Sequence, residues 1–284
     1  MNMNLKYLIA YLALIFGVLI ISAFLSPLAA SIYLSIIIIV IGLLAIVWQK
    51  FLHKEPVIDL GFKISRNVAI GLGIGIVYIS FFLFVNWIFG LFKIVEYEFN
   101  MTYQAQFQEN NLFLFVLVSL LIETAIMFIP ALFGEELAWR GYILSKLDTK
   151  YGKIKVIGIN SLLFAVWHLP VYFSLYIGGA LDKGVGFLIL SLFWHGISVI
   201  SINILFLTTK ELYSVSFVHA ISDAFAYVIF GNPNLGYASQ DALYHVIILN
   251  EVLYNIFTLV FHLFSIGIMI GIYLLVQRYK LVRY

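Results

Sequence analysis

The sequence has no cysteine and few charged residues, and these two features exclude several classes of site and of protein. Without cysteine the chain has no disulfides, no thiolate nucleophile and no thiolate ligands for a metal. Only 11% of its residues are charged and 63% are hydrophobic, whereas soluble domains have about 25% and about 45–50%. The net charge of +2 and the lack of a Lys/Arg run argue against nucleic acid as a partner. With a mean hydropathy of +1.06, the composition is that of a polytopic membrane protein, whose partner is the lipid bilayer.

The apolar residues gather into runs long enough to cross a bilayer, for which about 20 residues are needed. We expect one helix from each run: residues 7–25, 31–49, 68–92, 112–134, 156–178, 185–207, 212–231 and 252–276. The fourth helix is expected to continue to about residue 145. The sequence therefore predicts an all-α fold, with residues 1–284 forming a single integral membrane domain of about eight transmembrane helices.

The basic residues divide unevenly between alternate loops of this bundle. If the N-terminus lies inside the cell, 14 of the 16 Lys and Arg residues fall on inside loops and ends, and only Lys93 and Lys183 fall outside. Cytoplasmic loops of membrane proteins carry such an excess of positive charge. The distribution therefore predicts a protein of the cell membrane with both termini in the cytoplasm.

Three of the apolar segments carry ionisable residues, which are costly inside a membrane and mark functional sites. With a helical rise of 1.5 Å per residue, these side chains lie roughly 14–20 Å from the nearest cytoplasmic basic residues, in one slab of the membrane. We therefore expect a single polar site that opens toward the cytoplasm, composed of Glu135, Glu136, Arg140, His168, His219 and Asp223.

The spacing within each segment suggests how these side chains cooperate. Glu136 and Arg140 are four residues apart, hence on one helix face, where the guanidinium can hold the carboxylate ionised and fixed. Glu135 points about 100° away from Glu136 and is freer to react. His219 and Asp223 have the same four-residue spacing, so Asp223 can orient the imidazole.

Other polar and small residues in the spans have structural interpretations. Pro130 and Pro170 are expected to kink their helices near the site, because each removes a helical hydrogen bond. The pattern Gly71-x-Gly73-x-Gly75 predicts close packing between helices. A further group is interpreted as side chains that satisfy neighbouring helices: His195, Asn203, Asn250 and His262.

The residue types at the expected site suit hydrolysis of a peptide bond. A carboxylate beside a histidine can activate water, and a second histidine can donate to the developing oxyanion. No serine is placed as a nucleophile, so water is the expected attacker. The site residues are also candidate ligands for a divalent metal such as zinc, which leaves the cofactor as either none or a metal held by Glu135, Glu136, His168, His219 and Asp223.

The same residue types allow a second class of function. Intramembrane Glu, His and Asp also form proton relays, so a proton-coupled transporter is an alternative. Transporters often show inverted repeats or paired broken helices, and the sequence has neither pattern.

Three motifs follow one another on successive helical segments: Glu135-Glu136-Leu-Ala-Trp-Arg140-Gly141, Phe164-x-x-x-His168 and His219-x-x-x-Asp223. In this order they resemble the CPBP family of CAAX-processing and bacteriocin-processing intramembrane proteases, also called type II CAAX prenyl endopeptidases. The resemblance covers residues 112–230. Trp139 stands where the family often has Phe, and Asp223 where relatives carry Asn or Asp.

The resemblance implies a helical membrane core of about eight helices with a polar cavity open to the cytoplasm. It implies that Glu135 with His168 activates water, and that His219 with Asp223 stabilises the oxyanion or completes a metal site. The implied activity is intramembrane endopeptidase cleavage of a membrane-associated peptide or protein. Some relatives are bacteriocin-immunity or membrane-scaffold proteins, so a non-catalytic protein of the same fold is a further alternative.

Overall fold

The structure, a computed structural model, describes residues 3–22, 24–90, 92–96, 112–170, 172–173, 184–230, 244–248 and 251–279. Its helices are α1 (Met3–Ser22), α2 (Pro27–Val47), α3 (Asn67–Phe89), α5 (Leu112–Pro130), α6 (Ser145–Asp148), α7 (Lys153–Trp167), α9 (Gly184–Thr209), α10 (Leu212–Phe230) and α11 (Glu251–Tyr279). Two π-helices, η1 (Trp48–Leu52) and η4 (Ala131–Leu144), and the short 3-10 helix η2 (Val57–Leu60) complete the helical part. The predicted helical fold class is confirmed.

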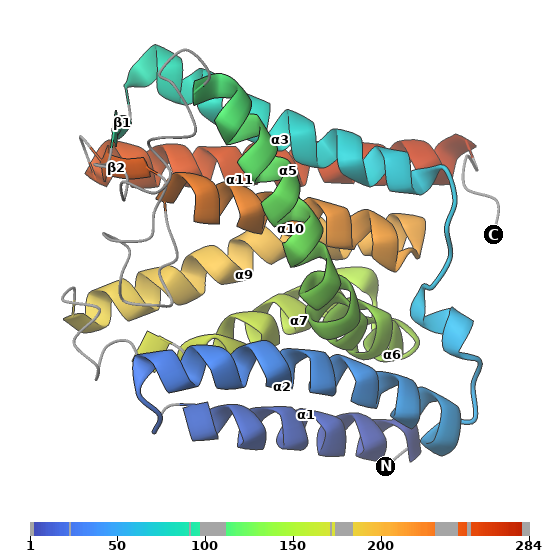
Figure 1. The fold of residues 1–284 in the computed structure, drawn as a ribbon. Helices are drawn as coiled ribbons and strands as arrows, with labels where there is room; N and C mark the ends of the chain where they lie inside the picture. The colour runs from blue at the N-terminus through green and yellow to red at the C-terminus, as the bar shows by residue number, and fades with distance from the viewer. Residues whose placement is uncertain are drawn as a thin grey trace.

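One small sheet was not predicted. Strands β1 (Phe92–Glu96) and β2 (Tyr244–Ile248) pair antiparallel, with Phe92 opposite Ile248. The strand β1 follows α3 and β2 precedes α11, so the ribbon joins two helices that are distant in the sequence but neighbours in the bundle (Figure 1).

Every predicted apolar run contains a helix, but the number of membrane crossings is only partly supported. Within the described residues, six helical segments are long and apolar enough to cross a membrane: 5–22, 32–52, 67–85, 117–148, 192–209 and 255–276. The two remaining helices are α7, with 15 residues, and α10, which carries His219, Asp223 and three serines. The prediction of about eight crossings is thus not confirmed, because α7 is short and α10 is interrupted by polar side chains.

The outward faces of the bundle are apolar, as expected of an integral membrane protein. Exposed side chains on α1, α2, α5 and α11 include Ile20, Ile36, Leu121, Ile122 and Val252, each more than half exposed. The start of α1 and the end of α11 lie at the same end of the bundle (Figure 1). An even number of crossings requires this arrangement, whereas the cytoplasmic location of that end stays a prediction.

The centre of the bundle is η4. This helix packs against α2, α5, α7 and α10, and all of its residues except Phe133 and Glu135 are buried. Close approach to α2 depends on small residues, because a Cβ on Gly42 would collide with the Phe133 carbonyl oxygen. A segment with this much buried backbone holds its side chains in fixed positions, which suits a site.

The loop after α2 closes over the end of η4. His53 Nε2 lies 2.7 Å from the Tyr142 hydroxyl, and Lys146 forms an ion pair with Glu55. Burial and the positive charge of Lys146 lower the pKa of His53. Burial alone would raise the pKa of Glu55, but the bonds from Lys146 and Gln49 outweigh it and the pKa is lowered. Near neutral pH the loop is therefore tied to η4 by a neutral imidazole and to α6 by an ionised carboxylate.

The glycine pattern of α3 marks a close helix contact, as predicted. A Cβ on Gly71 would collide with the backbone of Ser214 on α10, and one on Gly75 would lie 2.9 Å from Ile221 Cδ1. A Cβ on Gly73, by contrast, would meet nothing within 4 Å. The contact therefore depends on two of the three glycines.

This difference gives a matched pair of substitutions. Gly71→Ala is expected to lower the stability by about 1–3 kcal/mol, the usual effect of overpacking a core. Gly73→Ala is expected to leave it unchanged or raise it by about 0.5–1 kcal/mol, because alanine favours the helix. Thermal unfolding of both variants in detergent would measure the difference. Equal melting temperatures would contradict the close α3–α10 contact.

Candidate active site

The first part of the site depends on a change of helix type at Pro130. The helix α5 ends at Pro130 and continues directly as the π-helix η4, with no break in the chain. Proline has no N–H for the Ile126 carbonyl, and loss of that bond favours a shift of the bonding pattern by one residue. Pro130 therefore changes the winding of the helix just before Glu135. The kink predicted at Pro130 takes this form.

Glu136 is the most enclosed carboxylate of the cluster. One of its oxygens, Oε1, accepts from Arg140 NH1 at 3.0 Å and lies 2.7 Å from His219 Nδ1. Neither Glu136 nor Arg140 has any exposed side-chain surface. The predicted pairing of Glu136 with Arg140 is confirmed, and it fixes Glu136 as a charged anchor rather than an accessible reactant.

Arg140 connects three helices through its guanidinium. Its Nε donates to Asn203 Oδ1 on α9 at 3.2 Å, and Asn203 Nδ2 donates to Ser161 Oγ on α7 at 3.1 Å. The guanidinium carbon also lies 4.6 Å from the centre of the Phe164 ring, a cation–π contact. Arg140 therefore holds η4, α7 and α9 in register around Glu136.

His219 lies at the centre of three carboxylates. Its Nδ1 faces Glu136, while its Nε2 is 3.3 Å from Asp223 Oδ2 and 3.9 Å from Glu135 Oε2. Since an ionised carboxylate only accepts hydrogen bonds, both ring nitrogens of His219 are placed to donate. The helices η4 and α10 thus bring together four of the predicted residues.

Glu135 differs from its neighbour in both access and bonding. Its side chain is 16% exposed whereas that of Glu136 is fully buried. The Oε2 atom of each glutamate is buried without a hydrogen-bond partner among the described residues, but Oε1 of Glu136 is held by Arg140 and His219. Asp223 is more open still, with 42% of its side chain exposed. The two carboxylates therefore differ in access, and the reactive role of Glu135 stays a prediction.

His168 follows the last residue of α7, two residues before Pro170. Its Nδ1 lies 2.9 Å from the Phe164 carbonyl oxygen, which can only accept, so Nδ1 carries the hydrogen and Nε2 of the neutral ring is free to take a proton. The ring is flanked by Phe164, with centroids 4.8 Å apart, and by His195 of α9, at 4.1 Å. Within the described part of the chain, no hydrogen bond or ion pair joins His168 to Glu135.

Residues 117–225 match the family model described as "Rce1-like: Type II CAAX prenyl endopeptidase Rce1-like". By this match, the segment is similar to the type II CAAX prenyl endopeptidases. It contains all six predicted site residues and lies within the predicted core of residues 112–230, so the resemblance based on the three motifs is confirmed. No curated protein and no solved structure matches the chain at a significant level.

The side chains of the Rce1-like segment do not form a set of metal ligands. Within the described residues, no group of three or more His, Asp or Glu side chains is placed to hold a metal ion. The reason lies in the contacts above, because Glu136 is bound by Arg140 and His219 has carboxylates at both ring nitrogens. His168 makes its contacts with Phe164 and His195 instead. The mechanism below therefore uses the protein groups alone.

The Rce1-like segment also depends on residues that were given only a structural interpretation from the sequence. Asn203 does satisfy neighbouring helices, but its partner is the site's arginine. His195 stacks on His168, and Tyr172 lies 3.2 Å from its Nδ1. His262 Nδ1 lies 3.0 Å from the Tyr78 hydroxyl on α3, so this histidine does bond a neighbouring helix. Asn250 lies outside the described residues. Each of these residues could be noticed in the sequence as a polar side chain in an apolar span. Its bonding partner, however, is known only from the fold.

Proposed function

We propose that the chain is an intramembrane endopeptidase that hydrolyses a peptide bond with a water activated by Glu135 and His168. At the level of the family, the Rce1-like match supports a protease of the CAAX type. The observation that carries the proposal is the difference between the surroundings of Glu135 and Glu136. Glu136 is fully buried and paired with Arg140 and His219, while Glu135 is partly exposed and its Oε2 lies 3.9 Å from His219 Nε2.

In the proposed reaction, Glu135 takes a proton from water as the water oxygen attacks the peptide carbonyl carbon. In this proposal Nε2 of His168 shares the role of base. The carbonyl oxygen becomes an oxyanion and accepts a hydrogen bond from His219 Nε2. The C–N bond then breaks, the proton passes from Glu135 to the leaving amine, and the products are a carboxylate and an amine.

The positions of Glu136 and Arg140 explain how His219 is held for this step. The Glu136 carboxylate fixes Nδ1 of the imidazole at 2.7 Å, so Nε2 is directed toward Glu135 and Asp223. Glu136 itself is kept in place by the Arg140 guanidinium. Preorganised donors of this kind contribute most when the side chains beneath them cannot move.

The proposal is tested by cleavage of a membrane-anchored peptide by the purified protein in lipid, with the products identified by mass spectrometry. Parallel reactions with and without a chelator would separate metal-free from metal-dependent hydrolysis. A folded protein that cleaves no peptide from a broad membrane-anchored library would favour a non-catalytic immunity or scaffold role. The family match gives no support to the transporter alternative, which we do not carry further.

Asp223→Asn is expected to keep or raise kcat/KM. A group that stabilises the oxyanion must donate a hydrogen bond, and an ionised aspartate cannot donate whereas asparagine can. Rates measured across the pH range for both forms check this. The opposite result is that the unaltered protein requires stoichiometric zinc and that Asp223→Asn loses the activity. That result would indicate a metal site instead.

The proposed substrate is a membrane-associated peptide or protein that reaches the site from the cytoplasm, with both termini of the enzyme on that side. The positions of the basic residues support this orientation, as do the start of α1 and the end of α11 at one end of the bundle. Because the chain has no cysteine, Asn2→Cys and Arg283→Cys each introduce a single label site. Both are expected to react with an impermeant thiol reagent only in opened cells. Glu109→Cys is the control, and it should react in intact cells; the reverse pattern would overturn the orientation.

A further inference from the structure

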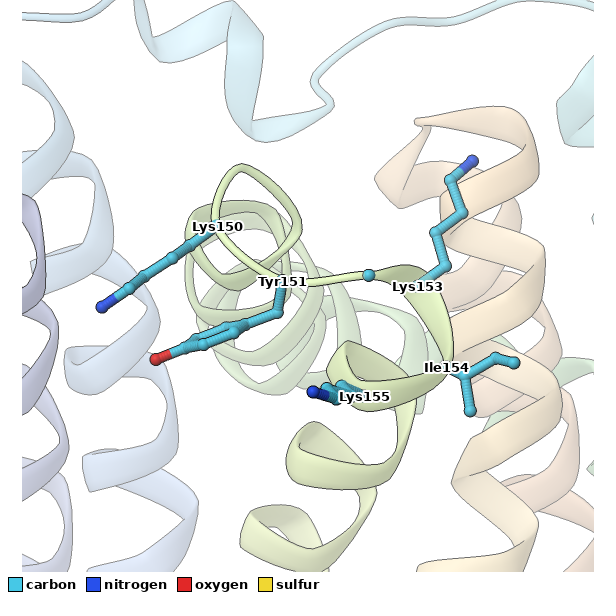
Figure 2. Close-up of a pocket in the computed structure, with 6 residues that line it drawn as sticks. Lys150, Tyr151, Lys153, Ile154 and Lys155 are labelled. Atoms are coloured by element: carbon cyan, nitrogen blue, oxygen red, sulfur yellow. The ribbon is translucent and has the colours of Figure 1, made fainter.

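Two buried asparagines tie neighbouring helices to η4, one from α7 and one from α9. The start of α7 is open, since Ile154 is exposed and Figure 2 shows Lys150 and Lys153 extending away from one another. Further along the same helix Asn160 has no exposed surface, and neither has Asn203 of α9. A buried amide needs hydrogen-bond partners, so the partner of each asparagine shows what that asparagine holds in place.

The two asparagines bond different parts of η4. Asn160 Nδ2 donates to the backbone carbonyl oxygen of Trp139 at 3.1 Å. Asn203 Oδ1 instead accepts from the side chain of Arg140, through Nε at 3.2 Å. Asn160 therefore fixes the path of the main chain of η4, whereas Asn203 fixes a side chain of the candidate site.

The bond to Asn203 decides the direction of the Arg140 guanidinium. Within the described residues, NH1 donates to Glu136, Nε donates to Asn203, and NH2 has no partner. The Phe164 ring lies 4.6 Å from the guanidinium carbon, and this contact leaves the group free to turn in its own plane. Because the guanidinium is a rigid planar fork, two bonds fix its rotation, whereas the bond to Glu136 alone would not.

Asn203 is itself held in place from α7. Its Nδ2 donates to Ser161 Oγ at 3.1 Å, and Ser161 is buried as well. Since arginine only donates hydrogen bonds, the amide oxygen has to face Arg140, and the bond to Ser161 keeps it there. The direction of the guanidinium thus depends on a side chain that touches none of the carboxylates or histidines of the site.

We propose that Asn203 is a positioning residue for peptide hydrolysis, which acts on the site through Arg140 and Glu136. The contacts run from Asn203 to Arg140 at 3.2 Å, from Arg140 to Glu136 at 3.0 Å, and from Glu136 to His219 Nδ1 at 2.7 Å. Loss of the first bond lets the guanidinium turn, and the carboxylate that fixes the imidazole moves with it. The effect on the rate rests on the proposed function, in which His219 stabilises the oxyanion.

Asn203→Leu is compared with its matched control Asn160→Leu, both in the whole purified protein in lipid. Each replaces a fully buried asparagine by an apolar side chain of similar size and removes one hydrogen bond to η4, so both should lower the melting temperature. Asn203→Leu alone is expected to lower kcat, by up to about 100-fold, because a small displacement of a reacting group can cost that much. Its KM should stay within a few-fold. Equal losses of kcat in the two variants would overturn the proposal.

Ser161→Ala tests the order of the contacts. Ser161 reaches the guanidinium through Asn203, so its substitution should lower kcat by less than Asn203→Leu does. In a protein that already carries Asn203→Leu, it should have no further effect on kcat. A double-mutant cycle on kcat measures this dependence. Additive losses would show that Ser161 acts by a separate route and would contradict the proposed order.

A spectroscopic measurement separates this inference from the proposed function. In protein labelled with ¹⁵N-histidine, the His219 N–H that faces Glu136 should give its own signal, assigned by its loss in His219→Gln. Asn203→Leu should shift and broaden this signal, and Asn160→Leu should not. A shifted signal in a protein that cleaves no peptide would support the positioning of His219 and reject hydrolysis. An unchanged signal in Asn203→Leu would overturn the positioning role, whatever the activity of the protein.

Discussion

Glu135→Gln is expected to abolish peptide hydrolysis while leaving the fold intact. The amide keeps the size and shape of the side chain but cannot take a proton from water, and general-base catalysis contributes about 10²–10⁴-fold to a rate. Because the side chain is partly exposed and its oxygen Oε2 has no hydrogen-bond partner, the substitution breaks no bond of that atom. Cleavage of the membrane-anchored peptide and thermal unfolding would be measured on the same preparation.

The control for this experiment is His195→Phe, which changes a polar residue near the site but keeps an aromatic ring against His168. It should retain most of the activity. If Glu135→Gln cleaves the peptide within a few-fold of the unaltered rate, Glu135 is not the base, and the proposed mechanism is wrong at its first step.

Glu136→Gln is expected to act mainly on stability. Removal of one partner from a buried ion pair leaves the other charge uncompensated, at a cost of about 3–5 kcal/mol. Arg140 has no exposed surface and would lose the one carboxylate that pairs with it in the described part of the chain, and the His219 imidazole would lose the charge that faces Nδ1. We expect a markedly lower melting temperature, with activity lost as His219 becomes free to turn.

The matched control is Asp148→Asn, which removes a carboxylate from the Lys210 pair. That pair is partly exposed on both sides, and such pairs contribute about 0–1 kcal/mol. Its melting temperature should therefore stay close to that of the unaltered protein. If Glu136→Gln is as stable as Asp148→Asn, the buried pair does not hold the bundle together in the way described.

The residues of the site could be found from the sequence because the membrane makes each of them conspicuous. An ionisable side chain in an apolar run is costly, so the acidic pair and the two histidines stand out without any knowledge of the fold. The four-residue spacings then predicted two contacts correctly, Glu136 with Arg140 and His219 with Asp223. Both contacts lie within a single helix, where sequence distance fixes spatial distance.

Contacts between helices could not be predicted in the same way. The bond of His219 to Glu136 joins residues 83 positions apart, and the bond of Arg140 to Asn203 joins residues 63 apart. They depend on how α9, α10 and η4 pack, which no local pattern encodes. Similarly, the loss of one bond at Pro130 was predictable, but the extent of the π-helix that follows it was not.

The continuous helix from α5 into η4 makes the site sensitive to chain length. A loop can absorb an added or deleted residue, but here residues 117–148 form one continuous helical segment that carries the acidic pair. Deletion of a single residue from α5 would rotate the acidic pair by about 100° and move it by about 1.5 Å relative to α10. Glu136 would then face lipid or another helix instead of His219. Substitutions in α5 can accumulate on its lipid face, but insertions and deletions there would be as harmful as loss of the glutamates themselves.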